Sequence, residues 1–435
     1  MSLLEKGFYK NLGPGILLAG AAIGGSHLLT STTAGAKFGF SLVGLILFTN
    51  LIKYPFLLVG TRFTVSTGKS LLEGFKERNK FYLPIFLVVS LITGTFTIAA
   101  VSFVTGVLLT NIPVFSSFPS MDLSIFVLVV CGLILLIGKY KALDNISKFL
   151  VTLLSFLTFF AVISLLLKGN LNSDIYRSFI KPELSPWKTS NLAFLIPLMG
   201  WMPCPVELCA WPSLWMFSKN NESNYKPSMK EAELDFNLGY LITVITAIFF
   251  LSLGALTMYG TGDGMLTGSG VSFAQNLIRL YTGAIGEWSK WIIVPASFAA
   301  MFSTTLTCLD AYPRSISAIQ GLLTLTDRGR MESKTEENRF YSWMVIHIFV
   351  SMILLLLARS DGIGVAEFVF AAMTGSFLTA PLFAWMAMDT INSNLVSPSN
   401  RYGLLLNSIC WVGICFLITI SLLFISNSFF GLGVP

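Results

Sequence analysis

Two apolar segments of the chain carry short interruptions whose residues could bind an ion or a small solute. Gly24-Gly25-Ser26, followed by His27, interrupts the first segment, and Gly200-Trp201-Met202-Pro203-Cys204-Pro205 interrupts the sixth. Unwound backbone in two matching halves is the strongest sequence sign of a substrate site near the bilayer midplane. Glycine and proline also serve as kinks or close contacts in membrane helices. Because both halves are interrupted, we interpret the interruptions as a binding site.

The composition indicates that the bilayer is the solvent of this protein. Of its 435 residues, 54% are hydrophobic and 11% are charged, and the mean hydropathy is +0.75, whereas a soluble domain has about 25% charged residues. The net charge of +6 comes from basic residues between apolar segments, which favours membrane topology over nucleic-acid binding. The six cysteines lie inside apolar segments and predict no disulfide framework.

The sequence predicts an all-α integral membrane protein with about eleven transmembrane helices, since each crossing needs about 20 apolar residues. The predicted spans are Gly13 to Phe38, Leu42 to Thr64, Leu83 to Thr110, Leu123 to Gly138, Ile146 to Leu167, Leu192 to Phe217, Leu238 to Tyr259, Trp291 to Leu309, Tyr341 to Leu357, Val365 to Met388, and Leu404 to Ile425. We expect one transmembrane domain over 1–435, with a first repeat at about 13–168, a second at about 190–390, and an extra helix at about 404–425.

The basic residues between spans predict the orientation of the chain. They gather in the even-numbered connections, which hold Lys69, Lys76, Arg78 and Lys80, then Lys139, Lys141 and Lys148, then Lys219, Lys226 and Lys230. Cytoplasmic loops are enriched in lysine and arginine. We therefore expect a multi-pass protein of the plasma or inner membrane, with a cytoplasmic N-terminus and an extracytoplasmic C-terminus.

The first two spans resemble those of the Nramp family of divalent-metal transporters, which have the LeuT-type fold. The resemblance rests on Gly13-Pro14-Gly15, Ala34-Gly35, Phe38-Gly39, Ser41-Leu42, Asn50-Leu51, Arg62, Thr67-Gly68 and Leu71, and on the Met202-Pro203 pair of the sixth span. It implies a five-plus-five inverted repeat with broken helices 1 and 6, and a secondary transporter that works by alternating access.

The chain departs from the family at the metal-binding positions. The family's first-helix Asp-Pro-Gly-Asn motif falls on Gly24-Gly25-Ser26-His27, and its Met-Pro-His motif falls on Met202-Pro203-Cys204. A tenth-helix glutamine of the family falls on Thr374. The third helix, which carries acidic residues in the family, has none between Lys80 and Asp122, so the family's proton route is missing there.

These departures favour a small anion such as bicarbonate over a metal ion, because half-helix N-termini attract anions when no carboxylate offsets their field. The predicted substrate residues are Gly24, Gly25, Ser26, His27, Lys53, Met202, Pro203, Cys204 and Thr374. His27 could instead bond a neighbouring carbonyl, Lys53 could stabilise a helix junction, and the glycines could permit close helix approach. The alternative is a proton- or sodium-coupled transporter of Mn²⁺ or Mg²⁺, held by Met202, Cys204 and Glu207. A ligand sensor without transport is a further alternative.

Sodium is the expected coupling ion. In LeuT-type proteins it binds between the first and eighth helices, which here implies carbonyls within Ala19 to Ile23, of which we name Ala19 and Ala22, and the hydroxyls of Ser303, Thr304 and Thr305. Such hydroxyls also commonly bond their own helix. The only histidines are His27 and His347, and no HExxH pair or paired catalytic aspartates occur, so we expect no enzyme and no cofactor. The expected partners are a small inorganic solute, the coupling ion and the lipid bilayer, with no nucleic acid and no protein partner.

Overall fold

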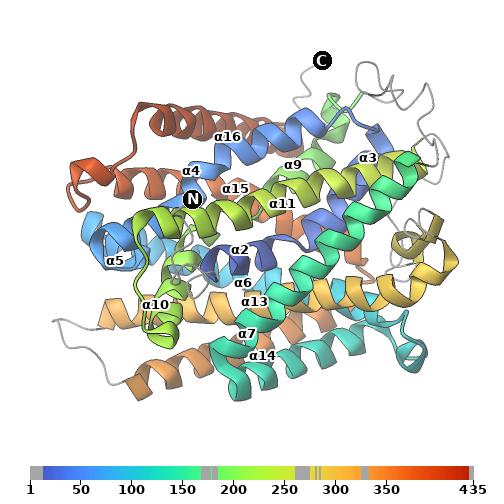
Figure 1. Cartoon of the computed structure of the whole chain (residues 1–435), viewed down its shortest axis with the longest axis horizontal. Coiled ribbons are helices and arrows are strands. Elements are labelled where there is room, and N and C mark those ends of the chain that lie inside the picture. The colour runs from blue at the N-terminus through green and yellow to red at the C-terminus, as the bar shows by residue number, and fades with distance from the viewer. Residues whose placement is uncertain are drawn as a thin grey trace.

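The computed structural model describes residues 13–167, 178, 185–259, 275–279, 282–283, 286–324 and 333–430, and within these ranges the chain forms helices and no strands. The helices lie roughly lengthwise in one bundle (Figure 1). They are α2 Pro14–Ala22, η1 Ser26–Ser31, α3 Thr32–Phe38, α4 Val43–Thr67, α5 Leu71–Arg78, α6 Tyr82–Leu109, η2 Pro113–Phe115, α7 Ser120–Leu167, η3 Thr189–Asn191, α9 Leu192–Gly200, η4 Val206–Ala210, α10 Trp211–Ser223, α11 Met229–Met258, η5 Glu287–Ser289, α13 Lys290–Thr324, α14 Ser333–Ser360, α15 Val365–Ile391, η6 Pro398–Asn400 and α16 Leu404–Phe430.

The helices account for the predicted spans. Within the described ranges, nine helical segments, two of them in α7, are long and apolar enough to cross a membrane, and the bent pair Pro14–Ala22 and Ser26–Phe38 makes a tenth. The predicted sixth span is divided among α9, η4 and α10, which are each too short to count alone. The all-α membrane fold with interrupted first and sixth helices is therefore confirmed.

The fourth and fifth predicted spans correspond to the apolar segments Ser120–Gly138 and Lys148–Leu167, although no loop separates them. They form one continuous helix, α7, over Ser120–Leu167, and Figure 1 shows it as two legs that meet at an angle beside its label. The sequence predicts a connection at the polar stretch between the two legs, and in the structure the backbone of this stretch is helical.

The long helix α11 packs along both halves of the first span. A Cβ atom added at Gly35 of α3 would overlap the Leu251 carbonyl of α11, and one added at Gly254 of α11 would overlap the Thr32 carbonyl. Small residues allow helix backbones to approach this closely in membranes. The second half of the broken span is therefore held directly against the backbone of α11.

This contact makes Gly254→Ala a test of the packing. We expect a clear fall in thermal stability, on the order of 1–3 kcal/mol, because the added methyl group meets backbone that cannot move aside. Gly375→Ala in α15 is the matched control, since an added Cβ there meets nothing within 4 Å. Thermal unfolding of the purified protein in detergent measures both, and equal melting temperatures would contradict the close α3 to α11 contact.

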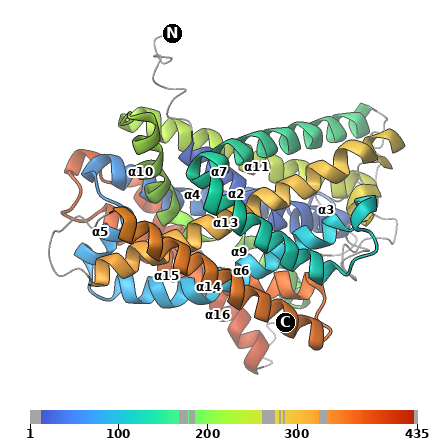
Figure 2. The same ribbon diagram turned by 90° about the horizontal axis from the view of Figure 1, so that it is seen from below.

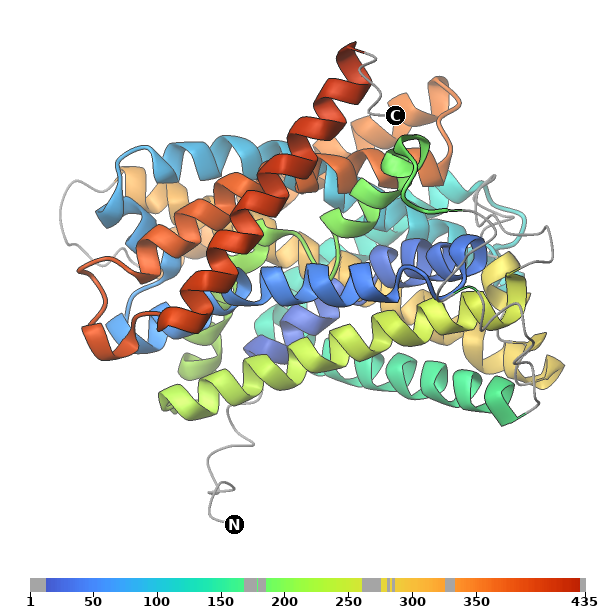
Figure 3. The ribbon, with the colours of Figure 1, turned by 90° about the horizontal axis from the view of Figure 1, so that it is seen from above.

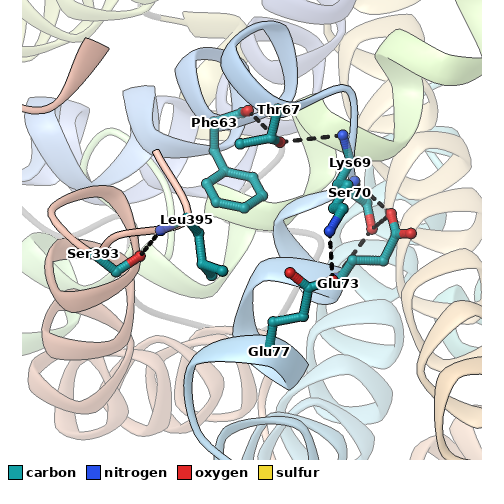
Figure 4. A network of polar contacts seen from close by, with 8 residues as sticks. All are labelled: Phe63, Thr67, Lys69, Ser70, Glu73, Glu77, Ser393 and Leu395. Atoms are coloured by element: carbon teal, nitrogen blue, oxygen red, sulfur yellow. Dashed lines mark hydrogen bonds and ion pairs between the residues drawn. The ribbon is translucent and has the colours of Figure 1, made fainter. Parts of the chain in front are cut away.

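Polar contacts fix the ends of several helices. The Asp235 carboxylate of α11 accepts hydrogen bonds from the Gly13 and Gly15 amides at 3.1 and 2.7 Å, and so caps the start of α2. Ser70 and Glu73 form a capping box that begins α5, beside the Lys69 to Glu77 ion pair (Figure 4). A carboxylate at a helix N-terminus is stabilising because it satisfies free N–H groups and opposes the helix dipole.

The last helix, α16, covers one outer face of the bundle. It packs against α4 and α15, and it crosses the outside of the molecule in the view of Figure 3. From the opposite side its end projects beyond the other helices (Figure 2). The division into two repeats and an extra helix stays a prediction.

Candidate functional site

The first break is a short turn pressed against α13. After α2 ends, the Ile23 amide bonds the Ala19 carbonyl and the Gly24 amide bonds the Ala22 carbonyl, and the chain bends by 49° before η1 and α3 continue. A Cβ added at Gly24 would lie 2.7 Å from the Thr304 hydroxyl oxygen. Gly24 thus allows close approach of α13, as the packing alternative expected.

The second break lies between α9 and η4. It runs from Trp201 to Pro205 and contains a cis peptide bond between Met202 and Pro203. The proline nitrogens at 203 and 205 have no N–H to donate, and two prolines this close together disfavour regular helix. The two breaks lie near each other, because the Trp201 ring is 3.2 Å from the Cβ position of Gly25.

A small cavity lies between the breaks. The cavity volume is about 20 Å³, which is enough for about one water molecule. It is lined by Ala21, Ala22, Gly25 and Ser26 of the first break, Thr97 and Val101 of α6, Trp201, Pro203, Cys204, Pro205, Leu208 and Trp211 of the sixth span, and Thr304, Cys308 and Tyr312 of α13. In this conformation the cavity admits only a small solute.

The structure brings together part of the predicted substrate set. Gly25, Ser26, Pro203 and Cys204 line the cavity, whereas Gly24, His27, Lys53, Met202 and Thr374 are not among its lining residues. The Thr374 hydroxyl bonds the Phe370 carbonyl of its own helix. The prediction missed Cys308 and Tyr312, although their four-residue spacing after Thr304 places the three on one face of a helix.

His27 joins two helices. Its Nδ1 lies 2.8 Å from the Ser26 hydroxyl and its Nε2 lies 3.0 Å from the Thr243 carbonyl of α11, and the side chain is fully buried. A carbonyl only accepts, so Nε2 donates. Both ring nitrogens are thus engaged in this conformation, including the carbonyl bond that the alternative expected, and a substrate contact of His27 stays a prediction.

Lys53 of α4 places a cation at the end of α9. Its Nζ donates to the carbonyls of Met199 at 2.6 Å, Gly200 at 2.8 Å and Cys204 at 3.3 Å, and it is fully buried. An ammonium group has three donors and no acceptor, so three carbonyls satisfy its charged form. Lys53 therefore stabilises the sixth-helix break, and its charge lies behind the cavity wall formed by Cys204.

The Glu207 carboxylate is bonded by two hydroxyl groups. Tyr312 donates at 2.6 Å to one oxygen and Thr93 at 2.7 Å to the other, and the side chain is only 1% exposed. Both oxygens thus have partners from other helices. Glu207 does not point freely toward Met202 and Cys204 as the metal alternative required.

A cluster of oxygens faces the first break from α13. The Thr304 hydroxyl lies 3.0 Å from the Gly20 carbonyl, 3.4 Å from the Ile23 carbonyl and 3.2 Å from the Ala300 carbonyl. Within the predicted stretch Ala19 to Ile23, the carbonyls that face Thr304 are those of Gly20 and Ile23. The Ala19 and Ala22 carbonyls that we named accept backbone amides instead.

The neighbours of Thr304 differ from one another. The Thr305 hydroxyl lies 2.9 Å from that of Thr105 on α6 and bonds the Met301 carbonyl. These contacts do not include the first break, and a sodium contact of Thr305 stays a prediction. Ser303 is fully buried beside Thr304.

Comparison with known proteins identifies the family. The profile of the family described as natural resistance-associated macrophage protein-like, or Nramp, matches residues 15–427. The chain belongs to the Nramp family. Uncharacterized protein PM0681 of Pasteurella multocida is 34% identical to this Nramp chain over 422 residues, which cover 96% of the chain and 92% of that protein.

Other similar Nramp proteins carry functional names. The divalent metal cation transporter MntH of Latilactobacillus sakei is 24% identical over 270 residues, which cover 60% of this chain and 57% of that protein. A manganese transporter from Eremococcus coleocola has a similar structure, with a TM-score of 0.72 at 15% identity, over 99% of this chain and 89% of its own. The Nramp chain is thus a multi-pass membrane transporter with the LeuT-type fold that its sequence predicted.

This Nramp chain lacks a conventional metal-ligand cluster in the part that the structure describes. There, no three histidine, cysteine, aspartate or glutamate side chains gather closely enough to hold a metal ion. Met202 is fully buried and does not line the cavity, whereas Cys204 and Cys308 both do. A divalent ion would need more oxygen, nitrogen or sulfur ligands than these.

Proposed function

We propose that this Nramp-family transporter carries a small inorganic anion such as bicarbonate together with Na⁺ by alternating access. The observation that supports an anionic substrate is the position of Lys53, whose ammonium group donates hydrogen bonds to the carbonyls at and just after the end of α9. Those carbonyls would otherwise offer oxygen ligands and negative potential to a cation. A divalent substrate would instead meet a fixed positive charge beside the cavity.

The half-helix beginning at Ser26 adds to this field. Gly25 and Ser26 line the cavity, and they stand at the start of the helical run Ser26–Phe38. The start of a helix presents free N–H groups and the positive end of its dipole. Because the chain has Gly24 where the family carries a carboxylate, this field favours an anion.

The oxygen cluster around Thr304 supports sodium as the coupling ion. Three carbonyls and one hydroxyl converge from α2, the first break and α13, and such a neutral oxygen set suits a monovalent hard cation. Carbonyls of an unwound segment coordinate Na⁺ in transporters with broken helices. Binding there would tie α13 to the first break.

A divalent metal cation is the second candidate. The names of the MntH relatives and of the manganese transporter support it better than they support an anion. Its donors here would be the Met202 thioether, the Cys204 thiol and backbone carbonyls. The Lys53 charge opposes it, so the two candidates differ in a measurable way.

We also propose the orientation and the membrane. The basic connections place the N-terminus in the cytoplasm and the C-terminus outside, in the plasma or inner membrane. The arrangement can be tested by labelling single cysteines introduced near each end, from one side of the membrane at a time.

Uptake into liposomes containing the purified protein tests the function. Labelled bicarbonate and Mn²⁺ are supplied in parallel, each with an inward Na⁺ gradient and with K⁺ in its place, and protein-free liposomes give the background. We expect bicarbonate accumulation that requires Na⁺, and no Mn²⁺ uptake. Saturable Mn²⁺ uptake without a bicarbonate signal would establish the second candidate, and saturable binding without accumulation would indicate a sensor.

A further inference from the structure

Glu207, Tyr312 and Thr93 form a buried group that the proposed function does not use. Tyr312 lines the cavity, whereas Glu207 lies behind it and Thr93 lies on α6. We propose that Glu207 is a proton-binding positioning residue, whose protonation frees the Tyr312 hydroxyl to donate a hydrogen bond to the substrate. This inference rests on the proposed binding of an anion in the cavity.

The Tyr312 and Thr93 hydroxyls each have one hydrogen atom to donate. The Tyr312 hydroxyl has one hydrogen, which it donates to Glu207 at 2.6 Å, while Thr93 donates to the other carboxylate oxygen at 2.7 Å. A carboxylate accepts both bonds, but a carboxylic acid must itself donate one. When a proton from water joins the oxygen that faces Tyr312, that oxygen donates to the phenol and the phenol hydrogen must turn elsewhere.

The cavity is the place to which this hydrogen can turn. Tyr312 lines it, and an anion there supplies a strong acceptor. Thr93 has another acceptor already, since its hydroxyl is 2.9 Å from the Val89 carbonyl. Without an anion, the acceptor beside the phenol is the neutral Thr97 hydroxyl, which is weaker than an anion. The proton is then better placed on the oxygen that faces Thr93, and Tyr312 stays bonded to Glu207. Anion and proton therefore favour each other.

The other buried acid near this group, Asp310 of α13, is already paired with Arg314 and accepts a hydrogen bond from Trp215, which leaves Glu207 as the acid that can respond here. The other titratable side chains whose charges act on it or on its partners are Cys204 and Cys209 of its own span and Cys308 of α13. Lys53, on the neighbouring helix α4, bonds the Cys204 carbonyl. On α15, Glu367 caps its own helix and Asp389 pairs with Arg78, and on α10, Glu222 pairs with Lys219.

The consequence is a pH-dependent substrate affinity. If the anion binds the protonated form, its apparent KM rises with pH and approaches a tenfold increase for each pH unit, because the competent fraction falls tenfold. Reciprocally, the anion shifts the titration of Glu207 to higher pH. Glu207→Gln fixes a neutral side chain that can donate to Tyr312, so its KM should not vary with pH.

Infrared difference spectroscopy tests the proton site without relying on transport. Spectra of the full-length protein in liposomes are recorded between about pH 5 and 9, a range in which buried glutamates can titrate. We expect a protonated-carboxyl band that Glu207→Gln removes and that Tyr312→Phe and Thr93→Val each shift. Glu231→Gln, at the exposed start of α11, is the matched control and should keep the band. The absence of any band that depends on Glu207 would overturn the proposal whatever the substrate is.

Addition of bicarbonate then tests the link to the substrate. The band midpoint should move to higher pH in the wild type and stay fixed in Tyr312→Phe. A fixed midpoint in a wild-type protein that accumulates bicarbonate would overturn the link while leaving the proposed function intact. If the protein instead accumulates Mn²⁺ and Mn²⁺ lowers the midpoint, both the proposed anion and this inference fail.

Discussion

Replacing Thr304 by valine should weaken sodium binding and raise the sodium concentration that uptake requires. Valine keeps the volume of threonine, but it lacks the hydroxyl that lies among the Gly20, Ile23 and Ala300 carbonyls. Loss of one polar partner of a charged group costs about 1.5–3 kcal/mol, so the sodium concentration for half-maximal uptake should rise about tenfold or more. Bicarbonate uptake over a series of Na⁺ concentrations measures the change.

Thr305→Val is the matched control for this substitution. It removes the same group from the next residue, where the hydroxyl bonds Thr105 and Met301 away from the first break. We expect some loss of stability and an unchanged sodium requirement. A shift of the sodium requirement in Thr305→Val but not in Thr304→Val would place the ion elsewhere.

Lys53→Met should strongly reduce anion uptake and lower the free energy of unfolding. Three buried carbonyls lose their donor, and hydrogen bonds to charged groups contribute about 1.5–3 kcal/mol each. The loss of the positive charge should also lower the bicarbonate uptake rate at least tenfold. Uptake and thermal unfolding of the same purified samples separate a change of substrate binding from a failure to fold.

Lys37→Met provides the comparison. Lys37, in α3, lies 5.1 Å from the Phe38 ring centre and 3.5 Å from the Asn191 side-chain oxygen at the edge of the bundle. Removal of this half-buried charge should change uptake little, because it is remote from the breaks. Normal bicarbonate uptake by a folded Lys53→Met protein would contradict the proposal that the Lys53 charge favours an anionic substrate.

The spans and the two breaks could be predicted from sequence because each is a local property. Apolar run length predicts a crossing, and Gly24-Gly25 or Pro203-Cys204-Pro205 disfavours helix wherever it occurs. The α7 segment shows the limit of this argument. A few polar residues between two apolar runs looked like a loop, yet the helix continues through them.

The directions of the site side chains depend on distant partners and were harder to predict. Lys53 bonds carbonyls 146, 147 and 151 residues away, and His27 bonds a carbonyl 216 residues away. No local sequence pattern predicts which of these distant groups will be in contact. Thr304, Cys308 and Tyr312 were accessible to reasoning, because one helical face carries all three, and only the first of them was named.

The closeness of Thr304 to Gly24 has a thermodynamic consequence. The Ile23 carbonyl faces the oxygen cluster, and Gly25, two residues later, lines the cavity. The segment from Ile23 to Gly25, together with Thr304, which also lines the cavity, would therefore contact both proposed ligands. Whichever ligand bound first would restrict the motion of this segment, so the second would bind at a lower entropic cost. Such shared ordering would produce positive cooperativity between Na⁺ and the anion.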